Sequence, residues 1–171
     1  FNLYAAAMYQ HALAPICRAF GEHERAKAFA RLGQDLQSAA VRAFWSRERG
    51  AFVNNRPWLD EEGAVGMDDR SLATALLFDQ CPNSNIAASL NTLADCPPEM
   101  GLSYPCNAGW RLWALARHGR IDVVLNDLRQ RWATMRSVIE NNTLQEFWQA
   151  RPDSTDEWSH CPVAPVYVLF M

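Results

Sequence analysis

Two pairs of helical segments, each joined at a glycine, constrain the fold of this chain most strongly. Residues 24–45 place apolar side chains at steps of three and four, the spacing of one face of an amphipathic helix: Phe29, Leu32, Leu36, Ala40, Ala43 and Phe44. Residues 120–135 do the same with Ile121, Val124, Leu125, Leu128, Trp132 and Met135. Another helical pattern precedes each stretch, at 3–20 and at 107–118. The sequence therefore predicts two helical hairpins.

The joints between these helices support the same interpretation. "RAFGEHERA" and "ARHGRIDVV" place Gly21 and Gly119 where one helix ends and the next begins a few residues later. Glycine adopts the left-handed conformation at helix ends at little energetic cost. Such short connections join antiparallel helices. Pro15 falls inside the first helix and is expected to kink it or to mark its last turns.

A weaker third pair of helices is predicted at 69–79 and 84–95, with Ser84 as the N-cap of the second. Asp68 or Asp69 either caps the helix that follows or orients a substrate. The stretches 46–68 and 97–106 lack a helical period, and strand-like alternation is confined to residues 51–54. The predicted fold class is all-α, built from αα-hairpins. Periodicity alone leaves a solenoid and a closed helical toroid open.

Composition excludes several classes of function. The 171 residues are 49% hydrophobic, as expected for one globular domain, and a net charge of −3 without a basic cluster disfavours a nucleic-acid partner. No apolar run is long enough to span a membrane. Five scattered cysteines without a C-x-x-C pair predict no metal site, and free thiols slightly favour the cytoplasm. A Cys81–Cys96 or a Cys96–Cys106 disulfide remains an alternative. Apolar segments at both ends predict part of a longer polypeptide.

Side chains suited to sugar binding gather in residues 141–165, "NNTLQEFWQARPDSTDEWSHCPVAP". Glu146 lies beside Trp148 in a stretch without helical period, and His160 follows. An indole ring stacks on the apolar face of a pyranose, while carboxylates, amides and imidazoles bind its hydroxyls. Trp58, in the earlier non-helical stretch, belongs to the same class. For Glu146 two interpretations stay open, an acid in the first turn of a helix and a general base. His160 is either a structural histidine or a sugar ligand.

The order of these motifs resembles a known family. "AFWSRERGAF", "DDRSLATALLFDQCP", "NAGWRLWALARHGRIDVVLNDLRQRW", "NNTLQEFW" and "WSHCPVAPVYVL" follow one another as in the C-terminal part of the six-hairpin catalytic domain of bacterial α-L-rhamnosidases, glycoside hydrolase family 78. The resemblance implies that Glu146 is the general base, that His160 lines the sugar pocket and that Trp148 and Trp58 form aromatic walls. It implies no cofactor. Where the family often has an aromatic residue before this Glu, the chain has Gln145.

The resemblance also implies an inverting mechanism, in which one carboxylic acid protonates the leaving oxygen and a second carboxylate activates water. Residues 1–171 would form an incomplete (α/α)6 toroid without the proton-donating acid, so the chain alone is expected to release little rhamnose from a rhamnoside. An oligomer is expected to cover the open side of the toroid. Two alternatives remain: another six-hairpin carbohydrate-active enzyme, and a non-catalytic helical interaction module.

Overall fold

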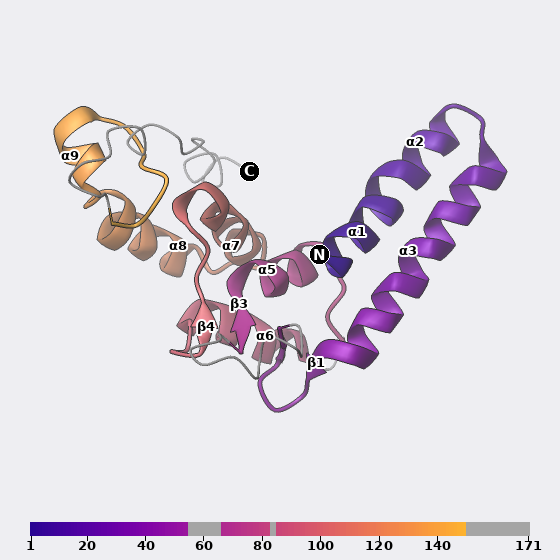
Figure 1. Ribbon diagram of the computed structural model, residues 1–171, viewed down its shortest axis with the longest axis horizontal. Coiled ribbons are helices and arrows are strands. Elements are labelled where there is room, and N and C mark those ends of the chain that lie inside the picture. The colour runs from indigo at the N-terminus through magenta and orange to yellow at the C-terminus, as the bar shows by residue number, and fades with distance from the viewer. Residues whose placement is uncertain (55–65, 83–84, 150–171) are drawn as a thin grey trace.

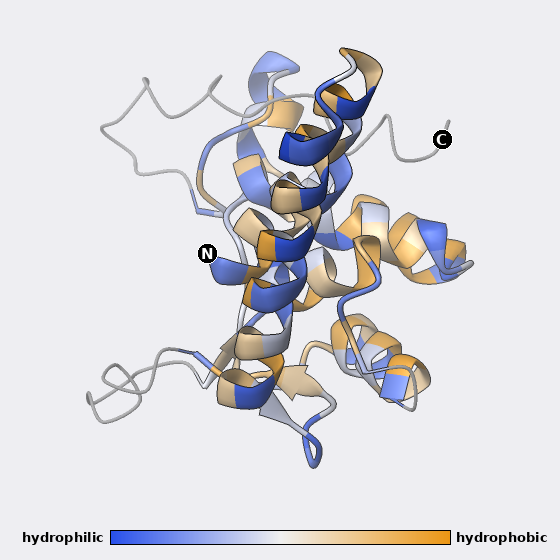
Figure 2. Cartoon of the chain, turned by 90° about the vertical axis from the view of Figure 1, so that its right-hand side faces the viewer, coloured by the Kyte–Doolittle hydropathy of each residue, from blue (hydrophilic) through white to orange (hydrophobic). Residues whose placement is uncertain are grey.

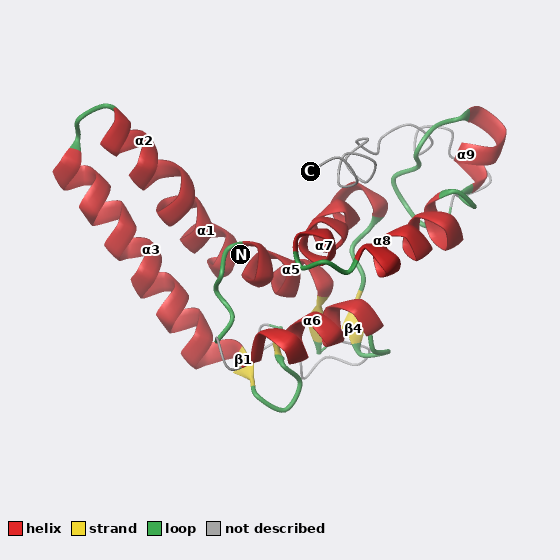
Figure 3. Ribbon diagram, turned by 180° about the vertical axis from the view of Figure 1, so that it is seen from behind, coloured by secondary structure: helices red, strands yellow, loops and turns green. Residues whose placement is uncertain are grey.

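The computed structural model describes residues 1–54, 66–82 and 85–149. This part of the chain is mostly helical, with four strands of two residues each. The helices form an open V, with α1 to α3 in one arm, α8 and α9 in the other, and α5 and α7 at the junction (Figures 1 and 3). The prediction of an all-α fold built from helical hairpins is confirmed.

The first arm is a long antiparallel hairpin. It consists of α1 (Asn2–Met8), a π-helical stretch η1 (Tyr9–Leu13), α2 (Ala14–Ala19) and α3 (His23–Phe44). Pro15 lies in the first turn of α2, directly after the π-helical stretch. Proline has no N–H to donate to the carbonyl of residue 11, so the wider helical turn relieves the crowding that a regular α-helix would impose there.

Both glycine joints have the predicted conformation. The φ angles of Gly21 and Gly119 are +78° and +77°, in the left-handed region. A Cβ atom at either position would have no heavy atom within 4 Å, so the backbone conformation rather than lack of space accounts for the glycine.

The remaining helices of the described ranges are α5 (Asp69–Leu77), α6 (Ile86–Asp95), α7 (Pro105–Arg117), α8 (Ile121–Asp127) with its π-helical continuation η3 (Leu128–Trp132), and the short α9 (Arg136–Asn141). Asp68 is the N-cap of α5, and its carboxylate accepts a hydrogen bond of 2.7 Å from the Ser71 amide. The N-cap of α6 is Asn85, and the predicted cap, Ser84, lies outside the described residues. The sequence periodicity did not predict α9.

Two small strand pairs hold the irregular stretches against the helices. β1 (Trp45–Ser46) pairs with β2 (Ala51–Phe52) in an antiparallel hairpin. β3 (Met67–Asp68) pairs in parallel with β4 (Met100–Gly101). Because β3 leads into α5 and β4 precedes α7, this second pair places the first turns of both helices side by side.

The hydrophobic core lies where α5 packs against α7. Apolar residues of α5, α6, α7 and α8 are buried there, including Leu72, Leu76, Leu77, Leu93, Leu112, Leu115 and Val124. Figure 2 shows apolar and polar stripes along the helices, as the three- and four-residue spacing predicted. Within the described ranges, no helix is long and apolar enough to cross a membrane. Cys17, Cys81, Cys96 and Cys106 are free thiols, which excludes both alternative disulfides.

Candidate functional site

Glu146 lies in an irregular segment that follows α9. The C-cap of α9 is Asn142, which has a left-handed conformation with φ of +57°. Residues 143–149 then run without helix or strand, and Glu146 is half-buried. It does not lie in the first turn of any helix that the structure describes. Its position is instead set by its neighbours in the segment.

The residue before Glu146 is the most firmly held of these neighbours. The Gln145 side chain is 1% exposed. Its Oε1 accepts a hydrogen bond of 3.1 Å from the amide of Ser137, in the first turn of α9. Its Nε2 donates to the carbonyl oxygens of Phe147 and Trp148, at 2.8 and 3.1 Å. The Gln145 amide therefore links α9 to the backbone that follows Glu146.

The two residues after Glu146 are held by aromatic packing. The Phe147 ring meets the Tyr104 ring edge-on, with 4.8 Å between centroids. The Trp148 indole N–H donates a hydrogen bond of 2.9 Å to the carbonyl of Ser103. The Trp132 ring lies edge-on to Trp148 at 5.2 Å, and the Arg131 guanidinium carbon stands 3.8 Å from the centre of the Trp148 ring. The guanidinium thus covers one face of the indole.

A buried charged cluster supports Arg131 and Trp132. The Asp127 carboxylate lies 3.3 Å from the Arg131 guanidinium and 3.5 Å from that of Arg111. Its second oxygen accepts a hydrogen bond of 3.2 Å from the Trp132 indole. Arg111 also donates to the carbonyls of Leu93 and Ala94, so the cluster joins α6, α7 and α8.

Ser103, which holds the Trp148 indole, also contacts the start of α5. Its amide and its hydroxyl both donate to Oδ1 of Asp69, at 3.0 and 2.6 Å. Asp69 is 1% exposed, and burial raises the pKa of its carboxyl group above the usual value of 3.8. The hydrogen bonds from Ser103 act in the opposite direction, because they stabilise the charged form.

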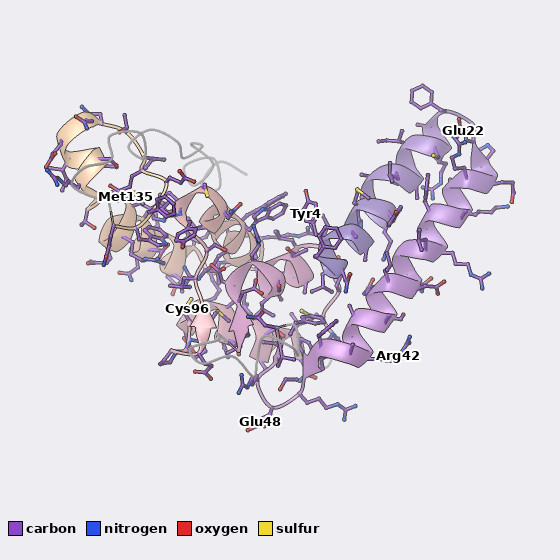
Figure 4. The ribbon with its side chains drawn as sticks, viewed as in Figure 1. Tyr4, Glu22, Arg42, Glu48, Cys96 and Met135 are labelled. Carbon is purple, nitrogen blue, oxygen red and sulfur yellow. The ribbon has the colours of Figure 1, made fainter. Side chains whose placement is uncertain are left out.

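A cavity of about 700 Å³ opens beside Ser103. Its walls come from α1, the N-terminal halves of α5 and α7 and the stretch after β4. The polar side chains that line it include Asp68, Arg70, Ser71 and Asn107, and the aromatic ones are Phe1, Tyr4 and Trp110. Tyr4, labelled in Figure 4, lies on α1. Its ring meets the Trp110 ring edge-on, with 5.9 Å between centroids. Such a mixture of aromatic faces and polar groups can bind a pyranose.

The structure describes two of the four predicted site residues. Glu146 and Trp148 belong to one short segment, and Trp148 contacts Ser103, which lines the cavity. Glu146 is not among the described residues that line it. Trp58 and His160 lie outside the described residues.

Sequence reasoning singled out the acidic pair at 68–69 but missed most of the cavity. Arg70 is adjacent in sequence to this pair, in the motif "DDRS". Asn107 and Trp110 belong to a helix whose apolar pattern indicated packing alone. Their side chains reach the cavity because the β3–β4 pair aligns the first turns of α5 and α7.

Among the described residues there is no group of three or more His, Cys, Asp and Glu side chains able to hold a metal ion.

Comparison with known proteins gives one informative match. No family model matches the chain, and none of the curated proteins searched matches it. A solved structure, the GH78 family rhamnosidase of Bacillus sp. GL1, superposes on 98% of this chain with a TM-score of 0.75 and 23% identity. The chain covers 18% of that protein. This similarity shows that the chain has the all-α fold of the corresponding part of that rhamnosidase.

Proposed function

We propose that this chain contributes to a glycoside hydrolase that cleaves terminal α-L-rhamnosides with inversion, and that Glu146 is the general base. The observation that supports this proposal most strongly is the superposition of 98% of the chain on a GH78 family rhamnosidase. The order of motifs around Glu146 resembles the same family.

The surroundings of Glu146 suit a base that activates water. Glu146 is half-buried, so the residue keeps some access to solvent while its backbone is held on both sides by Gln145 and Trp148. A general base must be held within hydrogen-bonding reach of the proton it removes. Segments with anchored neighbours satisfy this requirement better than free loops do.

The cavity beside Ser103 is the proposed sugar site. Tyr4 and Trp110 offer ring surfaces for stacking, and Asp68, Arg70 and Asn107 offer hydrogen-bonding groups for hydroxyls. Trp148, Trp58 and His160 are proposed to complete the pocket on the side of Glu146. No cofactor takes part in this mechanism.

In the proposed mechanism Glu146 removes a proton from water as the oxygen of that water bonds to the anomeric carbon. The bond from this carbon to the leaving oxygen breaks, and a second carboxylic acid protonates that oxygen. We assign the second carboxyl group to the part of the enzyme that this chain does not cover. The purified chain alone is accordingly expected to release little rhamnose from an aryl α-L-rhamnoside.

The test is a pair of isosteric substitutions in the full-length gene product. Glu146→Gln removes the base, whereas Glu140→Gln removes an exposed carboxylate of α9 that pairs with Arg136. We expect the first to lower kcat for an aryl α-L-rhamnoside by ~10²–10⁴-fold and the second to leave it unchanged. Unchanged turnover in Glu146→Gln, with the fold intact by circular dichroism, would reject Glu146 as the general base. Absence of turnover in the wild-type gene product would favour a helical interaction module. Turnover of a different aryl glycoside, and not of the α-L-rhamnoside, would indicate another six-hairpin carbohydrate-active enzyme.

A further inference from the structure

We propose that Gln145 is a positioning residue for Glu146, and that its buried amide sets the path of the backbone that carries the carboxylate. This inference rests on the proposed role of Glu146 as a general base. It goes further in naming the group that holds the base in place.

The first half of the argument is the bond to α9. Ser137 is the second residue of α9, and the amide N–H groups of a first helical turn have no partner within the helix. Gln145 Oε1 accepts the hydrogen bond from this amide at 3.1 Å. Both residues are at most 1% exposed, so water is a poor substitute for this bond. The side chain is thereby fixed to a helix.

The second half is the pair of bonds to the backbone beyond Glu146. The two N–H bonds of a glutamine amide point in directions fixed by its planar geometry. Nε2 of Gln145 donates to the carbonyls of Phe147 and Trp148, which follow Glu146 directly. These bonds draw the chain into a tight loop around the Gln145 amide, with Glu146 at the bend.

Trp148 supplies a second anchor two residues after Glu146. Its indole is held by the Ser103 carbonyl, the Trp132 edge and the Arg131 guanidinium. Glu146 therefore stands between two side chains that packing and hydrogen bonds immobilise. A displacement of about 1 Å at a reacting group can lower turnover ~10²-fold. Loss of the Gln145 amide is expected to have an effect of this kind.

The experiment separates positioning from a general effect on folding. Gln145→Met keeps the length of the side chain and removes all three hydrogen bonds. Gln145→Glu keeps the acceptor for Ser137 and removes the amide donors, and it replaces Gln145→Met in the same comparisons if that variant does not fold. Glu140→Gln is the control, because it changes an exposed carboxylate of α9 that pairs with Arg136 and leaves the three hydrogen bonds of Gln145 in place.

Each substitution is made in the full-length gene product and combined with Glu146→Gln, and kcat and KM are measured for an aryl α-L-rhamnoside. We expect Gln145→Met to lower kcat ~10–100-fold with little change in KM, and Glu140→Gln to leave kcat unchanged. In the Glu146→Gln background, Gln145→Met should cost no further turnover, because a group that acts only through Glu146 has nothing left to position.

Two results would overturn the inference while leaving the proposed function intact. One is a kcat close to that of the wild type in both Gln145 variants. The other is a full additional loss when Gln145→Met is combined with Glu146→Gln, which would show that Gln145 supports some other part of the site. Unchanged turnover in Glu146→Gln alone would instead reject the proposed function.

Discussion

The buried carboxyl group of Asp69, beside the cavity residue Ser103, makes the stability of the fold depend on pH. It is 1% exposed at the start of α5 and receives two hydrogen bonds from Ser103. Burial is the largest cause of the upward shift in its pKa, and the nearby Asp68 carboxylate adds to it. The native state therefore holds the Asp69 proton to a higher pH than the unfolded chain does.

The sign of the resulting pH dependence follows from this shift. Below the unfolded pKa of about 3.8, Asp69 is protonated in both the native and the unfolded state. Its stabilising contribution to the free energy of unfolding is then fully present. As the pH rises through the raised native pKa, the native state must ionise a buried group, and stability falls. Each pKa unit of the shift corresponds to about 1.4 kcal/mol.

Asp69→Asn should abolish the part of the pH dependence of stability that Asp69 causes, because an amide does not titrate. The difference in the free energy of unfolding between variant and wild type, measured by urea titration, should move in favour of the variant as the pH is raised from about 4. Asp122→Asn, at a side chain that is 75% exposed, serves as the control. A difference for Asp69→Asn that is constant with pH would contradict the assignment.

At the scale of the elements, α7 and α8 are joined by the buried ion pair of Arg111 with Asp127. Their side chains are 6% and 9% exposed. Asp127→Ala should lower the free energy of unfolding by about 3–5 kcal/mol, because the Arg111 charge would remain buried without its carboxylate. Asp122→Ala, which breaks the exposed pair of Asp122 with Arg120, should change it by less than about 0.5 kcal/mol. Equal effects of the two substitutions in thermal or urea unfolding would contradict this account.

The contact between α1 and α3 depends on Gly33. A Cβ atom there would lie 2.6 Å from Gln10 Cγ and 2.9 Å from the Ala6 carbonyl oxygen. Gly33→Ala should therefore destabilise the chain by ~1–3 kcal/mol, although alanine is the better helix former. Ser38→Ala, on the exposed side of α3, should be nearly neutral. A gain in stability for Gly33→Ala in urea unfolding would show that the two helices do not approach this closely.

The elements show what could be predicted from sequence and what could not. Apolar spacing and two glycine joints predicted α3, α7 and α8, because these features depend on neighbours a few residues apart. The spacing gave no sign of α9, since its six residues carry too few apolar positions to form a periodic pattern. The cavity was not predictable either, because Tyr4, Arg70 and Asn107 meet only through the packing of α1, α5 and α7.

At the scale of the whole molecule, the open V leaves apolar side chains without cover. Phe1 is fully exposed, and Tyr4 and Leu102, which line the cavity with it, are 54% and 40% exposed. Exposed apolar surface favours association, so we expect the isolated chain to form a dimer or a larger oligomer through this side. Multi-angle light scattering at high protein concentration is the measurement, and a monomer under these conditions would contradict the expectation.

The claim that Glu146 activates water is tested most directly by chemical rescue of Glu146→Ala in the full-length gene product. Azide attacks without losing a proton, so it replaces both the base and the water. We predict that the variant hydrolyses an aryl α-L-rhamnoside ~10²–10⁴-fold more slowly than the wild type. Sodium azide should restore turnover and yield β-L-rhamnosyl azide, identified by NMR. Hydrolysis by the variant at the wild-type rate would contradict the assignment of Glu146 as the base. So would a rhamnosyl azide product of α configuration.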